Sequence, residues 1–324
     1  MQQDIADEIN ARALSPEPFL FVINYTADEA IIKPLSEINP ADCLFDFNGR
    51  TNCHATPDSS TAAPRWNVLP PDYAAYERSF NTVRANILRG NSYLVNLTCQ
   101  APVDCDLSLR DIFLRTEGRY RLFVRDRFTC FSPEPFIRIE GGHIYSHPMK
   151  GTADALSPDS LTALLADEKE AAEHATIVDL IRNDLSTVAH HVRVDDYRYA
   201  ETLLTNKGPI IQTSSRISGT LLRGYERHMG DILASQLPAG SITGAPKPQT
   251  LKIIAEAEDY DRGFYTGVMG ICQGGRLDSA VMIRFVEQSA DGLLFKAGGG
   301  VTSRSVCQSE YDEVVRKMYL PLKR

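Results

Sequence analysis

Long apolar runs are missing from this sequence of 324 residues. No stretch approaches the roughly 18 apolar residues that a helix needs to cross a bilayer. The first residues, MQQDIADEINARAL, are acidic and polar, which is not the character of a secretory signal. We therefore expect a protein that neither spans nor binds membranes, and a cytoplasmic location.

Cysteine pairs are missing as well. The seven cysteines are odd in number and include no C-x-x-C pair. Disulfide-stabilised secreted domains carry even numbers of cysteines, and structural zinc sites use closely spaced cysteine pairs. The cysteines argue against both and favour a reducing compartment.

Positive charge is in deficit. The chain has 34 Lys and Arg residues against 42 Asp and Glu residues, a formal net charge of −8. Nucleic acids and anionic membranes bind basic surfaces, so neither is expected as a partner. An anionic small substrate would need a local reversal of the field, from a bound cation or from clustered Lys and Arg.

The order of strand-like and helical patterns predicts an α+β fold. Strand-like runs occur in adjacent groups separated by helices rather than in strict alternation. Residues 18–25 form such a run, with 30–35 as its expected partner, and residues 71–89 have apolar side chains at helical spacing. Since no internal repeat or linker is evident, we expect one domain over residues 1–324, with an N-terminal layer at 1–70.

Two local patterns predict a particular hairpin and a particular helix. Residues 137–152 predict a hairpin with Gly141 and Gly142 at its turn. Residues 157–189 are the longest helical pattern, which opens at Ser157-Pro158 as N-cap and first helical position and has room for a break.

Two pairs of glutamates have the spacing of one helix face. Glu170 and Glu173 lie three residues apart on one expected helix, as do Glu310 and Glu313 on another. Such a pair often belongs to a solvated surface. Two pairs in otherwise apolar stretches also fit a shared hard cation, since Mg²⁺ is typically held by one or two carboxylates, water and substrate oxygens. Spacing alone leaves both interpretations open.

Lys150 lies near a turn, between Met149 and Gly151. A lysine desolvated there would lose its proton and become a nucleophile. A surface lysine beside a turn is the competing interpretation.

Two glycine-containing segments could bind an anion. Residues 240–247, GSITGAPK, lack the spacing of a nucleotide-binding loop, but the backbone and the hydroxyls of Ser241 and Thr243 could bind a carboxylate. Residues 297–300, AGGG, allow close approach of an anion to the backbone. Ordinary turn chemistry explains both segments equally well.

His174 is more typical of a helix residue with its hydrogen bonds satisfied than of a catalytic base.

Taken together, the motifs resemble the chorismate-utilising enzymes, which include anthranilate synthase, aminodeoxychorismate synthase component I and the isochorismate and salicylate synthases. Matching blocks occur in order from about residue 75 to the end. They are GNSYLVNLT (90–98), SPEPF (132–136), PMKGT (148–152), EHATIVDLIRNDLS (173–186), PAGSITGAPK (238–247), RGFYTGVMG (262–270), AVMIRF (280–285) and AGGGVTSRSVCQSEYDEVVRK (297–317). The first 70 residues match loosely, so the catalytic core is expected at 75–324.

The resemblance implies an α+β fold of two large antiparallel sheets packed face to face, with helices outside. It also implies an Mg²⁺ ion bound directly by Glu173 and Glu313, assisted through water by Glu170 and Glu310, with the ring carboxylate of chorismate on the metal. The remaining expected substrate contacts are Ser241, Thr243, Tyr265, Arg284, Gly298, Gly300 and Lys317.

Lys150 distinguishes the members of the family. Anthranilate synthases resemble P-[IL]-A-G-T at this point, whereas aminodeoxychorismate synthases resemble P-I-K-G-T and use the lysine as a nucleophile on C2 of chorismate. The water-activating lysine of the salicylate and isochorismate synthases has no match near Gly90, and the Leu-Glu-Ser signature of tryptophan-inhibited anthranilate synthases is missing. We therefore predict amination of chorismate at C4, on the route to para-aminobenzoate and folate, with Glu134 protonating the departing hydroxyl.

Two residues depart from the family pattern. Gln212 stands where the family usually has histidine, and it can donate a hydrogen bond but cannot carry a proton. Ser241 replaces a threonine and keeps the hydroxyl.

No glutaminase segment was recognised, so ammonia is expected from a separate glutamine amidotransferase or from solution. The alternatives are anthranilate synthase component I and a non-enzymatic chorismate-binding regulatory subunit.

Overall fold

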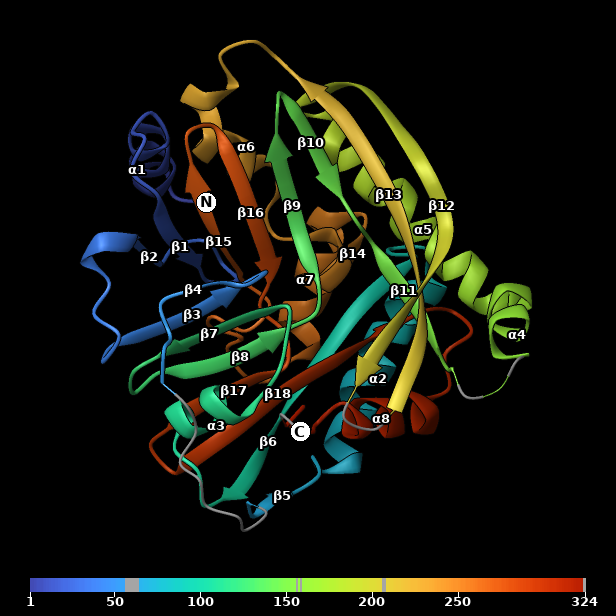
Figure 1. Ribbon diagram of the computed structural model, residues 1–324. Helices are drawn as coiled ribbons and strands as arrows, with labels where there is room; N and C mark the ends of the chain where they lie inside the picture. Colours follow the sequence, from blue (N-terminus) through green and yellow to red (C-terminus); the bar gives the residue numbers. More distant parts are fainter. Residues whose placement is uncertain (56–63, 156, 158, 206–207, 323–324) are drawn as a thin grey trace.

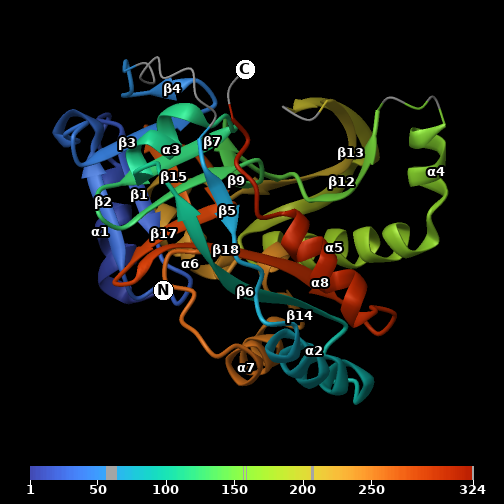
Figure 2. The ribbon, with the colours of Figure 1, turned by 90° about the horizontal axis from the view of Figure 1, so that it is seen from below.

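The computed structural model describes residues 1–55, 64–155, 157, 159–205 and 208–322. Within these residues the strands form two antiparallel sheets, which we name sheet A and sheet B. Figures 1 and 2 show the two sheets packed together, with the helices placed around them.

The elements are as follows. Sheet A has the order β11 (Met149–Asp154), β13 (Gly208–Leu221), β10 (His143–Ser146), β9 (Pro135–Glu140), β16 (Arg276–Val281), β15 (Val268–Gln273), β1 (Phe19–Ile23) and β2 (Ala30–Pro34), and β12 (Ala189–Thr205) pairs with β13. Sheet B has the order β14 (Gly244–Ala245), β6 (Leu94–Cys105), β18 (Gly292–Val301), β17 (Phe285–Ser289), β8 (Phe128–Ser132), β7 (Tyr120–Val124), β3 (Cys43–Phe47) and β4 (Arg50–Thr51), and β5 (Trp66–Val68) pairs with β6. The α-helices are α1 (Gln3–Ala13), α2 (Tyr73–Leu88), α3 (Leu109–Arg115), α4 (Ser160–Ala166), α5 (Glu168–Ser186), α6 (Met229–Gln236), α7 (Lys247–Ala257) and α8 (Cys307–Arg316), and the 3₁₀ turns are η1 (Leu35–Glu37), η2 (Tyr225–His228) and η3 (Gly240–Ile242).

Strand β1 shows how the layers are held together. All five of its residues are buried, because successive side chains point to opposite faces and both faces are covered. Leu20 and Val22 join the core between the sheets, while Phe19, Phe21 and Ile23 join the core that sheet A shares with α1, α5 and α6.

Sheet B is also covered on both faces. Phe128 of β8 lies between the sheets and stacks on Phe285 of β17, with ring centroids 4.7 Å apart. Phe131 of the same strand belongs to the outer core that sheet B shares with α2, α3, α7 and α8. The predicted α+β fold, with two antiparallel sheets face to face and helices outside, is therefore confirmed.

The first 70 residues supply strands to both sheets. The predicted pairing of residues 18–25 with 30–35 is confirmed, since β1 and β2 are adjacent in sheet A. Strands β3 and β4 continue sheet B beyond β7, and β5 pairs with β6.

The predicted hairpin ends earlier than expected. Gly141 and Gly142 form its turn with positive φ angles of 59° and 78°, as glycine allows. The second strand stops at Ser146, and after Pro148 the chain begins β11, which pairs with β13 instead of β9. Proline cannot donate a ladder hydrogen bond, which explains the interruption.

The long helical pattern is divided. It forms α4 and α5, and the break falls at Asp167, whose side chain accepts a hydrogen bond from the backbone N–H of Glu170 as the N-cap of α5. Helix α4 begins at Ser160 and not at Ser157, while Pro158 lies outside the described residues.

No helix in the described ranges is long and apolar enough to cross a membrane. The seven cysteines all fall in these ranges and are free thiols.

The double burial of the strands predicts a large difference between two leucines. Leu122 of β7 is fully buried between the sheets, whereas Leu222, just after β13, is 62% exposed. Leu122→Ala should lower the free energy of unfolding by about 2–5 kcal/mol because it leaves a cavity. The matched control Leu222→Ala should change it by less than about 0.5 kcal/mol. Urea denaturation measures both, and equal effects would contradict the packing described here.

Candidate active site

The loop that carries Ser241 is held tightly against β6. Its η3 turn is followed by β14, in which Gly244 pairs with Val95. Gly244 has a φ of 129°, and a Cβ at this position would lie 1.8 Å from the carbonyl oxygen of Leu94. Because no side chain fits there, the close approach of loop and strand requires glycine.

Thr243 differs from expectation. Its side chain is fully buried, and its hydroxyl donates a hydrogen bond of 2.8 Å to the carbonyl of Ala239. The Thr243 hydroxyl therefore shapes the loop from inside, whereas Ser241 remains partly exposed.

An ion pair joins the two motifs that are most specific to the family. Lys247, which ends GSITGAPK, lies 2.7 Å from the carboxylate of Asp184 near the end of α5, and it also donates to the carbonyl of Gln236. Both charged side chains are mostly buried. Burial raises the pKa of Asp184, and the Lys247 ammonium acts in the opposite direction. This pair was not predicted from the sequence, although the opposite charges of Asp184 and Lys247 within two matching motifs were a signal for it.

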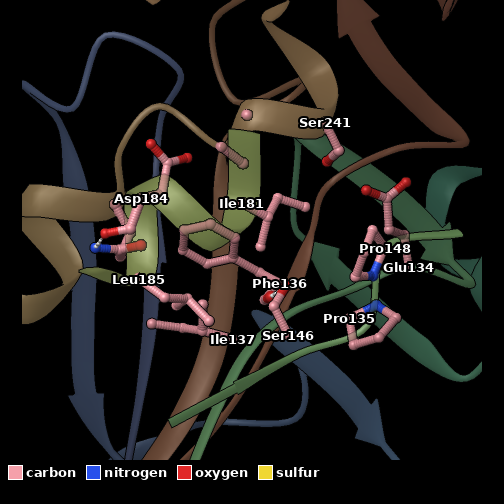
Figure 3. A pocket seen from close by; sticks show the side chains of 13 residues that line it. Glu134, Pro135, Phe136, Ile137, Ser146, Pro148, Ile181, Asp184, Leu185 and Ser241 are labelled. Carbon is pink, nitrogen blue, oxygen red and sulfur yellow. Dashed lines mark hydrogen bonds between the residues drawn. The ribbon is translucent and has the colours of Figure 1, made fainter. Parts of the chain in front are cut away.

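Beside this ion pair is a small cavity (Figure 3). Glu134, Asp184 and Ser241 all line it, and Figure 3 shows Glu134 and Ser241 on the same side. Glu134 follows β8, and its backbone N–H donates to the hydroxyl of Ser132. The cavity volume of about 20 Å³ has room for a water molecule but not for a substrate ring.

The strand that carries Lys150 runs beside α5. A Cβ on Gly151 would lie 3.1 Å from Oε2 of Glu170, and Gly151 has a φ of 82°. Glycine at this position therefore allows the Glu170 carboxylate to approach β11. Lys150 lies on β11, but its side chain is outside the part of the structure that is described.

Gln212 faces the same strand. It lies opposite Thr152 in the β11–β13 pairing, and its buried side-chain amide donates to the thioether of Met149. The structure thus brings Gln212, Glu170 and the backbone around Lys150 together.

A second group of predicted residues meets where β18 contacts α8. Lys317 lies 2.7 Å from the carboxylate of Glu313 and donates a 3.1 Å hydrogen bond to the carbonyl of Gly298. A Cβ on Gly298 would lie 2.6 Å from Cγ2 of Thr98, so the contact between β18 and β6 requires glycine. Gly300 lies two residues further along the same strand face. Figure 2 shows α2, α7 and α8 gathered around β6 and β18.

Tyr265 and Arg284 flank the core between the sheets. Tyr265 is buried, and burial raises its pKa, so its phenol is neutral and can donate a hydrogen bond. Arg284 lies between β16 and β17 at a φ of 54°, and its guanidinium lies 5.9 Å from the centre of the Tyr319 ring.

The four glutamates lie on two helices, α5 and α8. Glu173 of α5 and Glu310 of α8 are buried, at 7% and 3% exposure. Among the described residues, no three Cys, His, Asp or Glu side chains are close enough together to hold a metal. The structure therefore does not assemble the α5 and α8 pairs into a preformed cage. Carboxylate oxygens suit Mg²⁺, which usually takes one or two of them and completes its shell with water and substrate oxygens.

His174 has a structural position next to Glu173. It is buried, and its Nε2 lies 2.6 Å from the hydroxyl of Ser215 on β13. The Nε2 hydrogen bond fits the expected structural role of this helix histidine.

Comparisons with known proteins identify the family of the chain. The family model described as "chorismate binding enzyme" matches residues 13–323. An "uncharacterized PabA-like protein" of Haemophilus influenzae is 43% identical over 320 residues, covering 99% of this chain and 97% of that protein. Aminodeoxychorismate synthase component 1 of Salmonella typhimurium is 30% identical over 278 residues, covering 81% of this chain and 59% of that protein.

A solved structure points to another member of the family. Anthranilate synthase component I from Streptococcus pneumoniae superposes with a TM-score of 0.67 and 27% identity, covering 79% of this chain and 59% of that chain. The predicted resemblance to the chorismate-utilising enzymes, near aminodeoxychorismate synthase component I, is confirmed. The chain belongs to the chorismate-binding enzyme family and is a chorismate-utilising enzyme.

Proposed function

We propose that this enzyme aminates chorismate at C4 to give 4-amino-4-deoxychorismate, a precursor of para-aminobenzoate and folate, in the cytoplasm. The observation that carries the proposal is the position of PMKGT. Its Gly151 lets Glu170, a candidate metal ligand, approach the strand that bears Lys150, and Gln212 packs on Met149. The similarity to the Salmonella aminodeoxychorismate synthase component 1 supports it.

Three other lysines of this region are engaged by carboxylates. Lys247 pairs with Asp184, Lys296 with Glu287 and Lys317 with Glu313, at 2.6–2.7 Å. An ion-paired ammonium group has no lone pair to offer a carbon atom. The family motif gives the role of nucleophile to Lys150.

The proposed reaction has two displacement steps. The neutral amine of Lys150 bonds to C2, the two conjugated ring double bonds shift from C1=C2 and C5=C6 to C6=C1 and C4=C5, and the C4–O bond breaks as Glu134 supplies a proton, so that the hydroxyl leaves as water. Ammonia then bonds to C4 and returns a proton to Glu134, both double bonds shift back, and the C2–N bond breaks to release Lys150.

The other predicted residues bind and orient the substrate in this proposal. Arg284 supplies positive charge for its carboxylates, Lys317, Ser241 and Tyr265 supply hydrogen-bond donors, and Gly298 and Gly300 allow close approach to β18. Mg²⁺ at the glutamates would neutralise the ring carboxylate. Ammonia comes from a separate glutamine amidotransferase subunit or from solution, and the "component 1" in the Salmonella protein's name supports a second subunit.

Anthranilate synthase component I is the second candidate, favoured by the superposition with the Streptococcus protein. Incubation with chorismate, Mg²⁺ and ammonium separates the two. We expect a product that a lyase converts to para-aminobenzoate. Direct formation of anthranilate with release of pyruvate would refute the proposal.

Replacing Lys150 tests the nucleophile. Lys150→Ala should abolish formation of 4-amino-4-deoxychorismate, and the resulting P-M-A-G-T motif could allow slow attack of ammonia at C2. In the wild type without ammonia, mass spectrometry should find chorismate less one water on the peptide that contains Lys150. Lys252→Ala, which changes an exposed lysine of α7, is the control and should retain full activity. An adduct on another lysine would refute the assignment.

Removal of the metal tests the glutamates. EDTA should abolish turnover reversibly, with activity restored by added Mg²⁺. Glu313→Gln should raise the Mg²⁺ concentration required for half-maximal activity while leaving the thermal midpoint within a few degrees, because a half-exposed helix residue contributes about 0.5 kcal/mol or less. Glu256→Gln, on an exposed position of α7, should change neither. Full activity of Glu313→Gln in chelator would count against the metal site.

Glu134→Gln tests the general acid. The amide keeps the size of the side chain but cannot deliver a proton, so kcat should fall by about 100- to 10,000-fold with little change in chorismate affinity. Single-turnover kinetics and equilibrium binding separate the two quantities. A collapse of affinity instead would make Glu134 a substrate-binding or structural residue.

A further inference from the structure

A buried ion pair lies beneath the segments that are expected to contact chorismate. Arg262 is 2% exposed, and its Nε and Nη2 donate to both carboxylate oxygens of Glu258, at 2.7 and 2.6 Å. Such two-point contacts fix orientation as well as charge. Glu258 follows α7 directly, so the pair anchors the end of that helix.

The other hydrogen bonds of Arg262 reach three further segments. Its Nη1 donates to the carbonyl of Ile242, next to Ser241, and lies 3.4 Å from the hydroxyl of Thr266, next to Tyr265. Its Nη2 donates to the carbonyl of Asn96 on β6. The guanidinium lies 4.6 Å from the centre of the Tyr25 ring. One side chain therefore connects the Ser241 loop, the Tyr265 turn, β6 and the end of α7.

Glu258 extends the same connection to β6. Its Oε1 accepts hydrogen bonds of 2.8 Å from both the backbone N–H and the hydroxyl of Thr98. Thr98 is the residue whose methyl group contacts Gly298. The ion pair thereby also supports the β6–β18 contact on which Gly298 depends.

Lys296 holds the Tyr265 turn from the other side. It lies on β18 two residues before Gly298 and is 2% exposed. Its ammonium group donates to the carbonyls of Asp261 and Arg262, each at 3.1 Å, and pairs with Glu287 at 2.6 Å. These three contacts match the three donors of an ammonium group.

Stability alone does not account for this arrangement. A buried ion pair loses solvation on folding, and packed apolar side chains of similar volume are often as stabilising. A guanidinium instead offers five donors in a rigid plane, which can fix several carbonyls at set distances from one another. The carbonyls and hydroxyl fixed here belong to segments adjacent to three expected substrate contacts, Ser241, Tyr265 and Gly298.

We propose that Arg262 is a positioning residue for chorismate binding, which holds the Ser241 loop and the Tyr265 turn in register through its pairing with Glu258, assisted by Lys296. This inference rests on the proposed role of Ser241 and Tyr265 at the chorismate site. Loss of the planar fork frees the two segments to shift relative to each other, and small misplacements of binding groups have large effects on reactivity and affinity.

The test compares two buried arginines. Arg121 on β7 is 8% exposed, pairs with Asp46 and donates to the carbonyls of Phe113 and Thr116, so its contacts lie on β3 and around α3. Arg262→Lys and Arg121→Lys each keep the positive charge and remove the planar guanidinium with its five donors. Both should lower the thermal midpoint, whereas Arg262→Lys alone should raise the Kd and KM for chorismate, by about 10- to 100-fold.

A direct measurement of chorismate binding distinguishes failure of the proposed function from failure of the inference about Arg262. Calorimetry with the full chain, Mg²⁺ and chorismate measures affinity independently of the product formed. A wild-type protein without affinity for chorismate overturns the proposed function, and the inference with it. A wild-type protein that binds, together with an Arg262→Lys variant that loses thermal stability but binds equally well, overturns the inference alone.

A second variant covers the case in which Arg262→Lys does not fold. Glu258→Gln keeps the shape of the partner side chain and removes its charge, so it weakens the hold on Arg262 without emptying the space. It should raise the Kd for chorismate in the same direction, while kcat at saturating substrate changes less than KM. An unchanged Kd in folded Glu258→Gln would overturn the proposal.

Discussion

Burial of strands on both faces is the constraint that organises this protein. In β1 and β8, side chains that point one way enter the core between the sheets, and those that point the other way enter a core shared with helices. A charged side chain that enters one of these cores is therefore buried, and a buried charge is costly unless a group of opposite charge compensates it. Three ion pairs of the site region have at least one buried or mostly buried partner: Asp184 with Lys247, Glu258 with Arg262 and Glu287 with Lys296.

These ion pairs connect segments that belong to different sequence motifs. Asp184 ends one motif and Lys247 another, and their contact fixes the end of α5 relative to the start of α7. Arg262 connects the Ser241 loop with β6. A change in one partner would leave the other charge buried and unpaired, which is far more destabilising than the pair is stabilising. The motifs are therefore coupled through their buried charges as well as through the sheet hydrogen bonds.

The sequence was sufficient for those features that depend on short-range patterns. A run of β-forming residues predicted the β1–β2 pairing, and two glycines predicted the turn at Gly141 and Gly142, because strand propensity and positive φ are local properties. Two boundaries differed from the pattern. Pro148 has no N–H group to donate to a sheet, and the Asp167 side chain accepts a backbone hydrogen bond as the N-cap of a new helix.

The site was only partly predictable for a related reason. Motifs indicated which residues to expect, but the sequence contains no information on which way a hydroxyl turns. Thr243 bonds back to Ala239 inside the loop, so its hydroxyl supports the loop, whereas its neighbour Ser241 lines the cavity. The partners of Arg262 lie on four separate segments, and contacts between distant segments become visible only once the sheets have brought them together.

The acidic net charge has a consequence for substrate binding at the site. Chorismate is a dianion, and a protein with a net charge of −8 repels it at long range. Lys247, Lys296, Lys317 and Arg262 lie in the region, but each is paired with a carboxylate, so these pairs contribute dipoles rather than net positive charge. The attraction for a carboxylate must then come from groups that are not neutralised in this way. In the proposed site, a divalent cation at Glu173 and Glu313 would supply it. Substrate and metal would on this argument bind cooperatively, each lowering the electrostatic barrier for the other.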